Sequence, residues 1–126
     1  MQRIATANTG PAAVGPYSQA VVSGNLVFVS GQLPVSATTE YQPETFKEQV
    51  RQTLLNLGAA LSAAGSDLDH VIKVNGYLTE PSQLEPYNEV YAEILGHGPP
   101  ARTTVCVSLW GVALEIDCIA ERITVA

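Results

Sequence analysis

The chain has 126 residues, 46% of them hydrophobic, which is enough to build one domain with its own core over residues 1–126. The formal net charge of −6 leaves no large cationic surface, so nucleic acid is not expected as a partner. Because no apolar run approaches the roughly 18 residues that span a bilayer and the first residues lack an apolar leader, we expect a soluble, cytoplasmic protein without a membrane partner.

Charged residues are scarce, at 14% of the chain, whereas roughly 25% is usual in soluble proteins. A monomer of this composition would leave much uncharged surface in water, so we expect an oligomer. Cys106 and Cys118 form neither a Cys-x-x-Cys pair nor a pattern with a histidine, and His70 and His97 lie beside no ligand pattern. We therefore predict two buried, hydrophobic cysteines in a reducing compartment, with no metal site and no cofactor.

The first half of the chain predicts a hairpin and a long helix. Residues 19–22 and 26–34 are apolar and β-branched, and the tight-turn signal of residues 23–25 between them predicts a β-hairpin. A helix is expected to open at Pro43-Glu44 and to end near Gly65, because apolar residues recur between them every three or four positions: Phe46, Val50, Leu54, Leu57 and Leu61.

Charged residues occupy the other side of this helix at spacings that favour ion pairs within it. They are expected to form a solvated face and comprise Glu44, Lys47, Glu48 and Arg51.

The second half predicts a strand over 71–78, which completes a β-α-β unit with a right-handed crossover. A shorter helix is expected from Pro86, on the spacing of Tyr87, Tyr91, Ile94 and Leu95, and glycines and prolines from Gly96 to Pro100 stop it. Residues 102–109 and 113–123 follow as strands joined by a short connection at Trp110-Gly111. The order β-β-α-β-α-β-β predicts an α+β fold, a mixed sheet with two helices on one face.

Side-chain alternation assigns faces to the last two strands. Thr103, Val105, Val107 and Leu109 form the more apolar face of the first, which we expect the helices to cover, while Arg102, Thr104, Cys106 and Ser108 lie opposite. In the second strand the core set is Leu114, Ile116, Cys118 and Ala120, and Glu115, Asp117 and Glu121 look the other way. Arg102 and Glu115 are thus expected on the same face of the sheet, which is either solvated or the wall of a polar pocket.

Several motifs in order along nearly the whole chain resemble the YjgF/RidA family of reactive-intermediate deaminases: Gly15-Pro16-Tyr17-Ser18-Gln19-Ala20, Val29-Ser30-Gly31-Gln32-Leu33-Pro34, Asn88, Pro100-Ala101-Arg102 and Glu115. The resemblance implies a chorismate-mutase-like, RidA-like subunit that assembles as a homotrimer with active sites in the clefts between subunits. It further implies substrates that are enamines and imines made by PLP enzymes from serine or threonine, such as 2-aminoacrylate and 2-iminobutanoate, and 2-keto acids plus ammonia as products.

By the same resemblance, Arg102 binds the substrate carboxylate, which a planar guanidinium can hold through two parallel hydrogen bonds. Glu115 matches the acidic residue that orients or activates water, or it is a plain exposed strand residue. Tyr17, Ser30, Gly31, Asn88 and Thr104 are the remaining candidates for substrate binding. Tyr17 could instead be a packed ring, Gly31 a bulge glycine and Asn88 a local cap.

Two departures from the family pattern bear on the substrate. Thr104 stands where many relatives carry a cysteine, and the connection at Trp110 is shorter than in those relatives. A general imine deaminase is the leading hypothesis. The alternatives are a dedicated pathway deaminase, such as one acting on 2-aminomuconate, and a non-catalytic trimer that binds small carboxylates or a protein. The family names translation inhibitor and endoribonuclease rank last, because this acidic chain shows no phosphate-binding surface.

Overall fold

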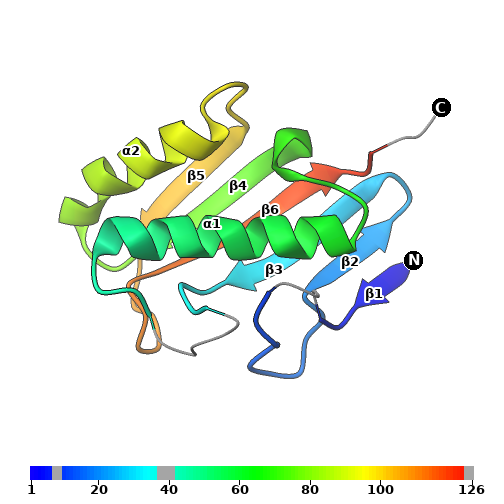
Figure 1. Ribbon diagram of the computed structural model, residues 1–126, viewed down its shortest axis with the longest axis horizontal. Helices are drawn as coiled ribbons and strands as arrows, with labels where there is room; N and C mark the ends of the chain where they lie inside the picture. Colours follow the sequence, from blue (N-terminus) through cyan, green and yellow to red (C-terminus); the bar gives the residue numbers. More distant parts are fainter. Residues whose placement is uncertain (7–9, 37–41, 124–126) are drawn as a thin grey trace.

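A computed structural model describes residues 1–6, 10–36 and 42–123 (Figure 1). In these residues six strands form one mixed sheet in the order β1-β2-β3-β6-β4-β5, and both long helices cover the same face of it (Figure 1). In chain order the elements are β1 (Gln2–Ile4), β2 (Ala20–Ser23), β3 (Leu26–Gln32), α1 (Phe46–Ala63), β4 (Val71–Leu78), α2 (Leu84–Leu95), β5 (Ala101–Cys106) and β6 (Leu114–Glu121). Short 3-10 turns, η1 (Leu68–His70) and η2 (Pro81–Gln83), precede β4 and α2.

The predicted hairpin is confirmed. Ser23 of β2 lies opposite Leu26 of β3, and Gly24 in the turn has a φ of 59°, a conformation that favours glycine. The sequence did not predict β1, which pairs along β2 at the edge of the sheet. Three residues are too few for a periodic pattern to be read.

Local chemistry sets the ends of both helices. Thr45 caps α1 by accepting a hydrogen bond from the Glu48 backbone nitrogen at 3.2 Å, so the helix begins three residues after Pro43. Gly65, with a φ of 82°, follows its end as predicted. The α2 helix begins at Leu84, two residues before the predicted start, because Pro86 fits the first turn, where backbone N–H groups have no partner within the helix.

The charged face of α1 is solvated as predicted, but its two cations form ion pairs with α2 and not with acidic residues of α1. Lys47 pairs with Glu89, and Arg51 pairs with Glu93 at 3.2 Å between Nη2 and Oε2. Both pairs are about half exposed, so each contributes roughly 0.2–1 kcal/mol. No helix within the described ranges has the length and apolar character needed to cross a membrane.

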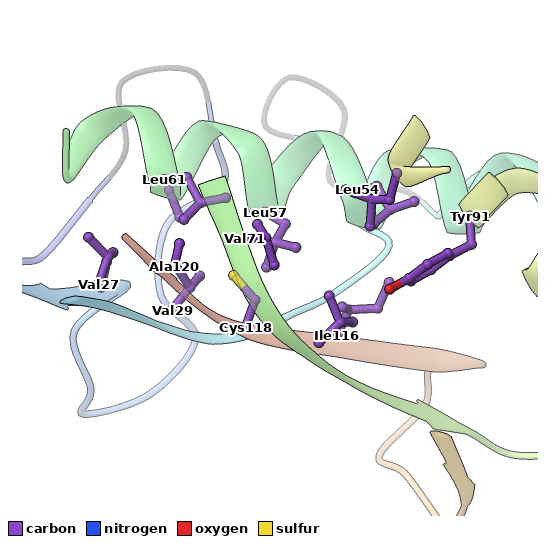
Figure 2. Close-up of a cluster of buried hydrophobic side chains, with 14 of the residues drawn as sticks. Val27, Val29, Leu54, Leu57, Leu61, Val71, Tyr91, Ile116, Cys118 and Ala120 are labelled. Atoms are coloured by element: carbon purple, nitrogen blue, oxygen red, sulfur yellow. The ribbon is translucent and has the colours of Figure 1, made fainter. Parts of the chain in front are cut away.

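The core lies between the helices and the covered face of the sheet. Figure 2 shows Leu54, Leu57 and Leu61 of α1 pointing toward the sheet, where Ile116, Cys118 and Ala120 of β6 lie below the helix. The predicted core set of β6 is confirmed, since its four members are all buried: Leu114, Ile116, Cys118 and Ala120. Burial raises the pKa of the Cys118 thiol to about 12. Cys106 is exposed instead of buried, because it lies at the end of the outermost strand.

The pairing of strands explains how the chain reaches its last two strands. β6 lies antiparallel between β3 and β4, so β3-α1-β4 is a β-α-β unit with β6 inserted into it. β5 adds to the outer edge of β4 in parallel. β5 and β6 are therefore not neighbours, and their connection passes the end of β4, where the Val107 nitrogen donates to the Leu78 carbonyl at 2.8 Å.

The predicted faces of β5 are inverted in the structure. Arg102 lies in register with Val74, whose side chain is fully buried beneath the helices, so Arg102 also faces α2. Val105 instead lies on the open face and is 41% exposed. The alternation misleads here because α2 presents tyrosine rings to this edge strand, and rings accommodate a cationic side chain.

Candidate functional site

A cavity of about 370 Å³ opens on the helix-free face of the sheet, beside the ends of β3 and β6. We call this cavity the Glu115 pocket. Four of the candidate residues line it: Tyr17, Ser30, Gly31 and Glu115. The rest of the lining is mainly apolar and was not predicted: Val14, Leu33, Trp110 and Val112. Trp110, in the β5–β6 connection, is 93% exposed at the rim.

Gly31 makes room for the carboxyl group of Glu115. The register of β3 against β6 shifts between Val29 and Gln32, which places a bulge at this glycine. A Cβ atom on residue 31 would lie 2.7 Å from Cδ of Glu115, which is closer than carbon atoms normally approach. The bulge glycine is thus part of the pocket, because a larger residue would displace the carboxyl group.

Two buried amide side chains hold the segment that carries Tyr17. Gln32 Nε2 donates to Gln19 Oε1 at 2.9 Å, and Gln19 Nε2 donates to the Pro11 carbonyl at 3.0 Å. Ser30 Oγ donates to the Ser18 carbonyl at 2.6 Å. Ser30 therefore fixes this segment to the bulge. Gln19 and Gln32 were not predicted as site residues, although two glutamines in otherwise apolar strands were a visible signal.

Burial raises the pKa of Glu115 above its ordinary value, and the nearby carboxylate of Asp117 adds to the effect. Asp117 is itself fixed by Asn75, whose Nδ2 donates to Oδ1 at 2.8 Å. Hydrogen bonding to Asp117 also raises the pKa of Tyr77. A carboxyl group with a raised pKa can take up and release a proton nearer neutral pH than an ordinary glutamate.

The other three candidates lie together on the helix-covered side, and we call Asn88, Arg102 and Thr104 the Arg102 cluster. Arg102 Nη1 donates to Asn88 Oδ1 at 2.8 Å. The guanidinium carbon lies 4.9 Å from the ring centre of Tyr91 and 5.5 Å from that of Tyr87. Thr104 Oγ1 is buried and has no hydrogen-bond partner in the described part of the chain.

Arg102 and Glu115 are far apart within one chain and lie on opposite faces of the sheet, so the prediction that they share a face is wrong. Val74 of β4 lies in register with Arg102 of β5 on one side and with Cys118 of β6 on the other. Glu115 lies three residues along β6 from Cys118. Two strand spacings and three residues of strand separate their Cα atoms by roughly 14 Å, with the side chains on opposite faces. Within one chain the candidate residues therefore form two separate groups.

No group of three or more histidine, cysteine, aspartate or glutamate side chains is arranged to hold a metal ion anywhere in residues 1–6, 10–36 and 42–123.

Comparisons with known proteins agree with one another. Residues 7–122 match the profile of the family described as Endoribonuclease L-PSP. Reactive Intermediate Deaminase A, chloroplastic, of Arabidopsis thaliana is 36% identical over 94% of this chain and 65% of its own length. The crystal structure of RidA from the Antarctic bacterium Psychrobacter sp. PAMC 21119 superposes with a TM-score of 0.90 at 41% identity, covering 96% of this chain and 99% of that one.

The crystal structure of Escherichia coli TdcF with bound serine also superposes with a TM-score of 0.90, at 35% identity and the same coverage, 96% of this chain and 99% of that one.

Proposed function

The chain belongs to the YjgF/RidA family, and on that premise we propose that it is a deaminase that hydrolyses reactive enamine and imine carboxylates such as 2-aminoacrylate and 2-iminobutanoate. The products are the 2-keto acid and ammonia. The observation that carries the proposal is that one chain contains both Glu115, a carboxyl group with a raised pKa, and Arg102, an arginine that forms no ion pair with an acidic side chain among the described residues.

Arg102 binds the substrate carboxylate in this proposal. Its guanidinium offers two parallel N–H groups to a carboxylate, which fixes the neighbouring imine carbon in place. The serine in the related TdcF structure is a small amino acid with such a carboxylate. Asn88 uses its amide oxygen on Arg102, so its Nδ2 can donate to the same ligand.

Glu115 supplies the proton transfers. A protonated imine is already electrophilic, so water attacks its carbon while the Glu115 carboxylate accepts a proton from that water. The resulting carbinolamine receives that proton from Glu115 on its nitrogen. The C–N bond then breaks, ammonia leaves with the bonding electron pair, and the Glu115 carboxylate accepts the hydroxyl proton as the carbonyl forms. An enamine first takes a proton at its terminal carbon to become the imine. This chemistry requires no metal and no cofactor.

The active site is proposed to lie between subunits of a homotrimer. A substrate of a few carbon atoms cannot reach across roughly 14 Å and through a sheet, so the Arg102 cluster of one copy must meet the Glu115 pocket of another. The helix-free face supports assembly, since it exposes large apolar side chains: Phe28, Ile72 and Val105. Cys106 and Cys118 are both free, which suits an enzyme acting in the reducing cytoplasm.

The test is hydrolysis of 2-iminobutanoate and 2-aminoacrylate generated in situ by a PLP-dependent dehydratase. Wild-type protein is expected to accelerate keto-acid release. Arg102→Ala should lower kcat/KM by on the order of a hundredfold or more, because the carboxylate loses its charged partner. Undiminished activity of a folded Arg102→Ala variant would refute the assignment of Arg102.

A further inference from the structure

An aromatic surface on the underside of α2 supports the guanidinium of Arg102. Tyr87 and Tyr91 are four residues apart and therefore lie on the same side of the helix. Their ring centres are 5.7 Å apart, and the guanidinium carbon of Arg102 is within 5.5 Å of both centres. This spacing is that of a cation–π contact with each ring.

Packing locks the two rings in place. Tyr87 is completely buried and Tyr91 is 6% exposed, so neither ring has room to turn away from Arg102. Gly76 of β4 makes room for Tyr87, because a Cβ atom there would lie 2.5 Å from the tyrosine oxygen and 3.1 Å from Cζ. The core therefore fixes the surface on which Arg102 rests.

Arg102 is held by groups that leave its charge unneutralised. Its contacts are two aromatic rings and the neutral amide oxygen of Asn88, and no acidic side chain in the described residues forms an ion pair with it. An acidic partner would compete with the carboxylate of a ligand. Rings and an amide can orient the cation without that competition.

We propose that Tyr87, Tyr91 and Asn88 are positioning residues that hold Arg102 in one orientation, ready for a substrate carboxylate. The inference rests on the proposed function, and it changes the expected role of Asn88, which acts chiefly through Arg102. An arginine that is ordered before binding loses less side-chain freedom when the carboxylate arrives, so its positioning residues should affect KM more than kcat.

The sharpest test exchanges Asn88, which is exposed, so a substitution there should leave the core intact. Asn88→Asp keeps an oxygen acceptor but adds a charge that pairs with Arg102, so KM for 2-iminobutanoate should rise about tenfold or more. Asn88→Ala removes the hydrogen bond to Arg102 without adding a charge and should raise KM by about threefold to tenfold; both variants lose the Nδ2 donor, so the added charge distinguishes them. A purely structural hydrogen bond predicts the reverse order, with Asp closer to wild type than Ala, and that result would overturn the proposal.

A second pair of variants tests the rings. Tyr91→Leu should raise KM by about fivefold to thirtyfold, and Tyr91→Phe, which keeps the ring face, should recover most of that loss. Val90→Ala is the matched control, since Val90 is fully buried in the same helix and has no aromatic ring to offer a cation. Equal KM values for Tyr91→Leu and Val90→Ala would contradict the inference.

The methyl ester of the same imino acid separates positioning from general damage. It lacks the carboxylate charge, so its kcat/KM should respond little to the Asn88 and Tyr91 variants; an equal response would show that they act on the whole site and would overturn the proposal. Full activity of Arg102→Ala refutes the proposed function itself. A large loss in Arg102→Ala beside wild-type KM values for Asn88→Asp and Tyr91→Leu refutes only the positioning role.

Discussion

Gly31→Ala tests whether the position of the Glu115 carboxyl group matters for activity. A Cβ atom on residue 31 would lie 2.7 Å from Cδ of Glu115, whereas carbon atoms in contact prefer about 3.5–4.0 Å. The carboxyl group must therefore retreat by roughly 1 Å, and a displacement of that size can lower a rate by about a hundredfold. We expect kcat/KM for 2-iminobutanoate to fall by about that factor.

The fold should survive this change, because the displaced atoms are the end of a flexible side chain. An off-rotamer glutamate costs about 0.5–1.5 kcal/mol, so urea denaturation should show a loss of unfolding free energy no larger than that. Gly98→Ala is the control, since a Cβ atom at residue 98 would meet no atom within 4 Å. If folded Gly31→Ala keeps kcat/KM within about twofold of wild type, Glu115 does not act from this position.

Two further predictions concern charge and burial. Asp117→Asn removes the negative charge that helps to raise the pKa of Glu115, so that pKa should fall, although burial, the larger cause, keeps it above its ordinary value. Because activity needs ionised Glu115, the acid limb of the pH profile of kcat/KM should move to lower pH. An unmoved or upward-shifted limb would show that Glu115 does not govern it. The buried Tyr87 hydroxyl has no hydrogen-bond partner in the described residues, so Tyr87→Phe should raise the unfolding free energy by about 1 kcal/mol in urea denaturation. A loss of stability would mean that the hydroxyl is hydrogen-bonded.

Sequence patterns predicted the elements whose formation is local. The hairpin around Gly24 depends on a two-residue turn, α1 depends on an apolar stripe with a cap, and the inward residues of β6 alternate cleanly against that stripe. The same reasoning failed for β5, since its face toward α2 carries Arg102, and for Cys106, since no local signal marks β5 as the edge of the sheet.

The sequence named candidate residues that the structure brings together in two groups, but it did not predict how those groups are placed. The motifs pointed to Tyr17, Ser30, Gly31 and Glu115, which line one pocket, and to Asn88 and Arg102, which form a hydrogen bond. Their separation could not be predicted, because it depends on β5 joining the far side of β4 and on which of its faces meets α2. Tyr87 and Tyr91 were interpreted only as a helix stripe, since spacing alone does not show that a cation rests on their rings.

The measurement that tests the account most directly takes two variants that should each be inactive, Arg102→Ala and Glu115→Gln, and mixes them by unfolding and refolding them together. If each active site takes Arg102 from one subunit and Glu115 from the next, random trimers of the two in equal amounts should regain about one quarter of all sites, because about three quarters of the trimers are mixed and each mixed trimer has one intact site. The account predicts that about this fraction of wild-type 2-iminobutanoate hydrolysis returns. Mixed assemblies with no more activity than the separate variants would contradict a site shared between subunits.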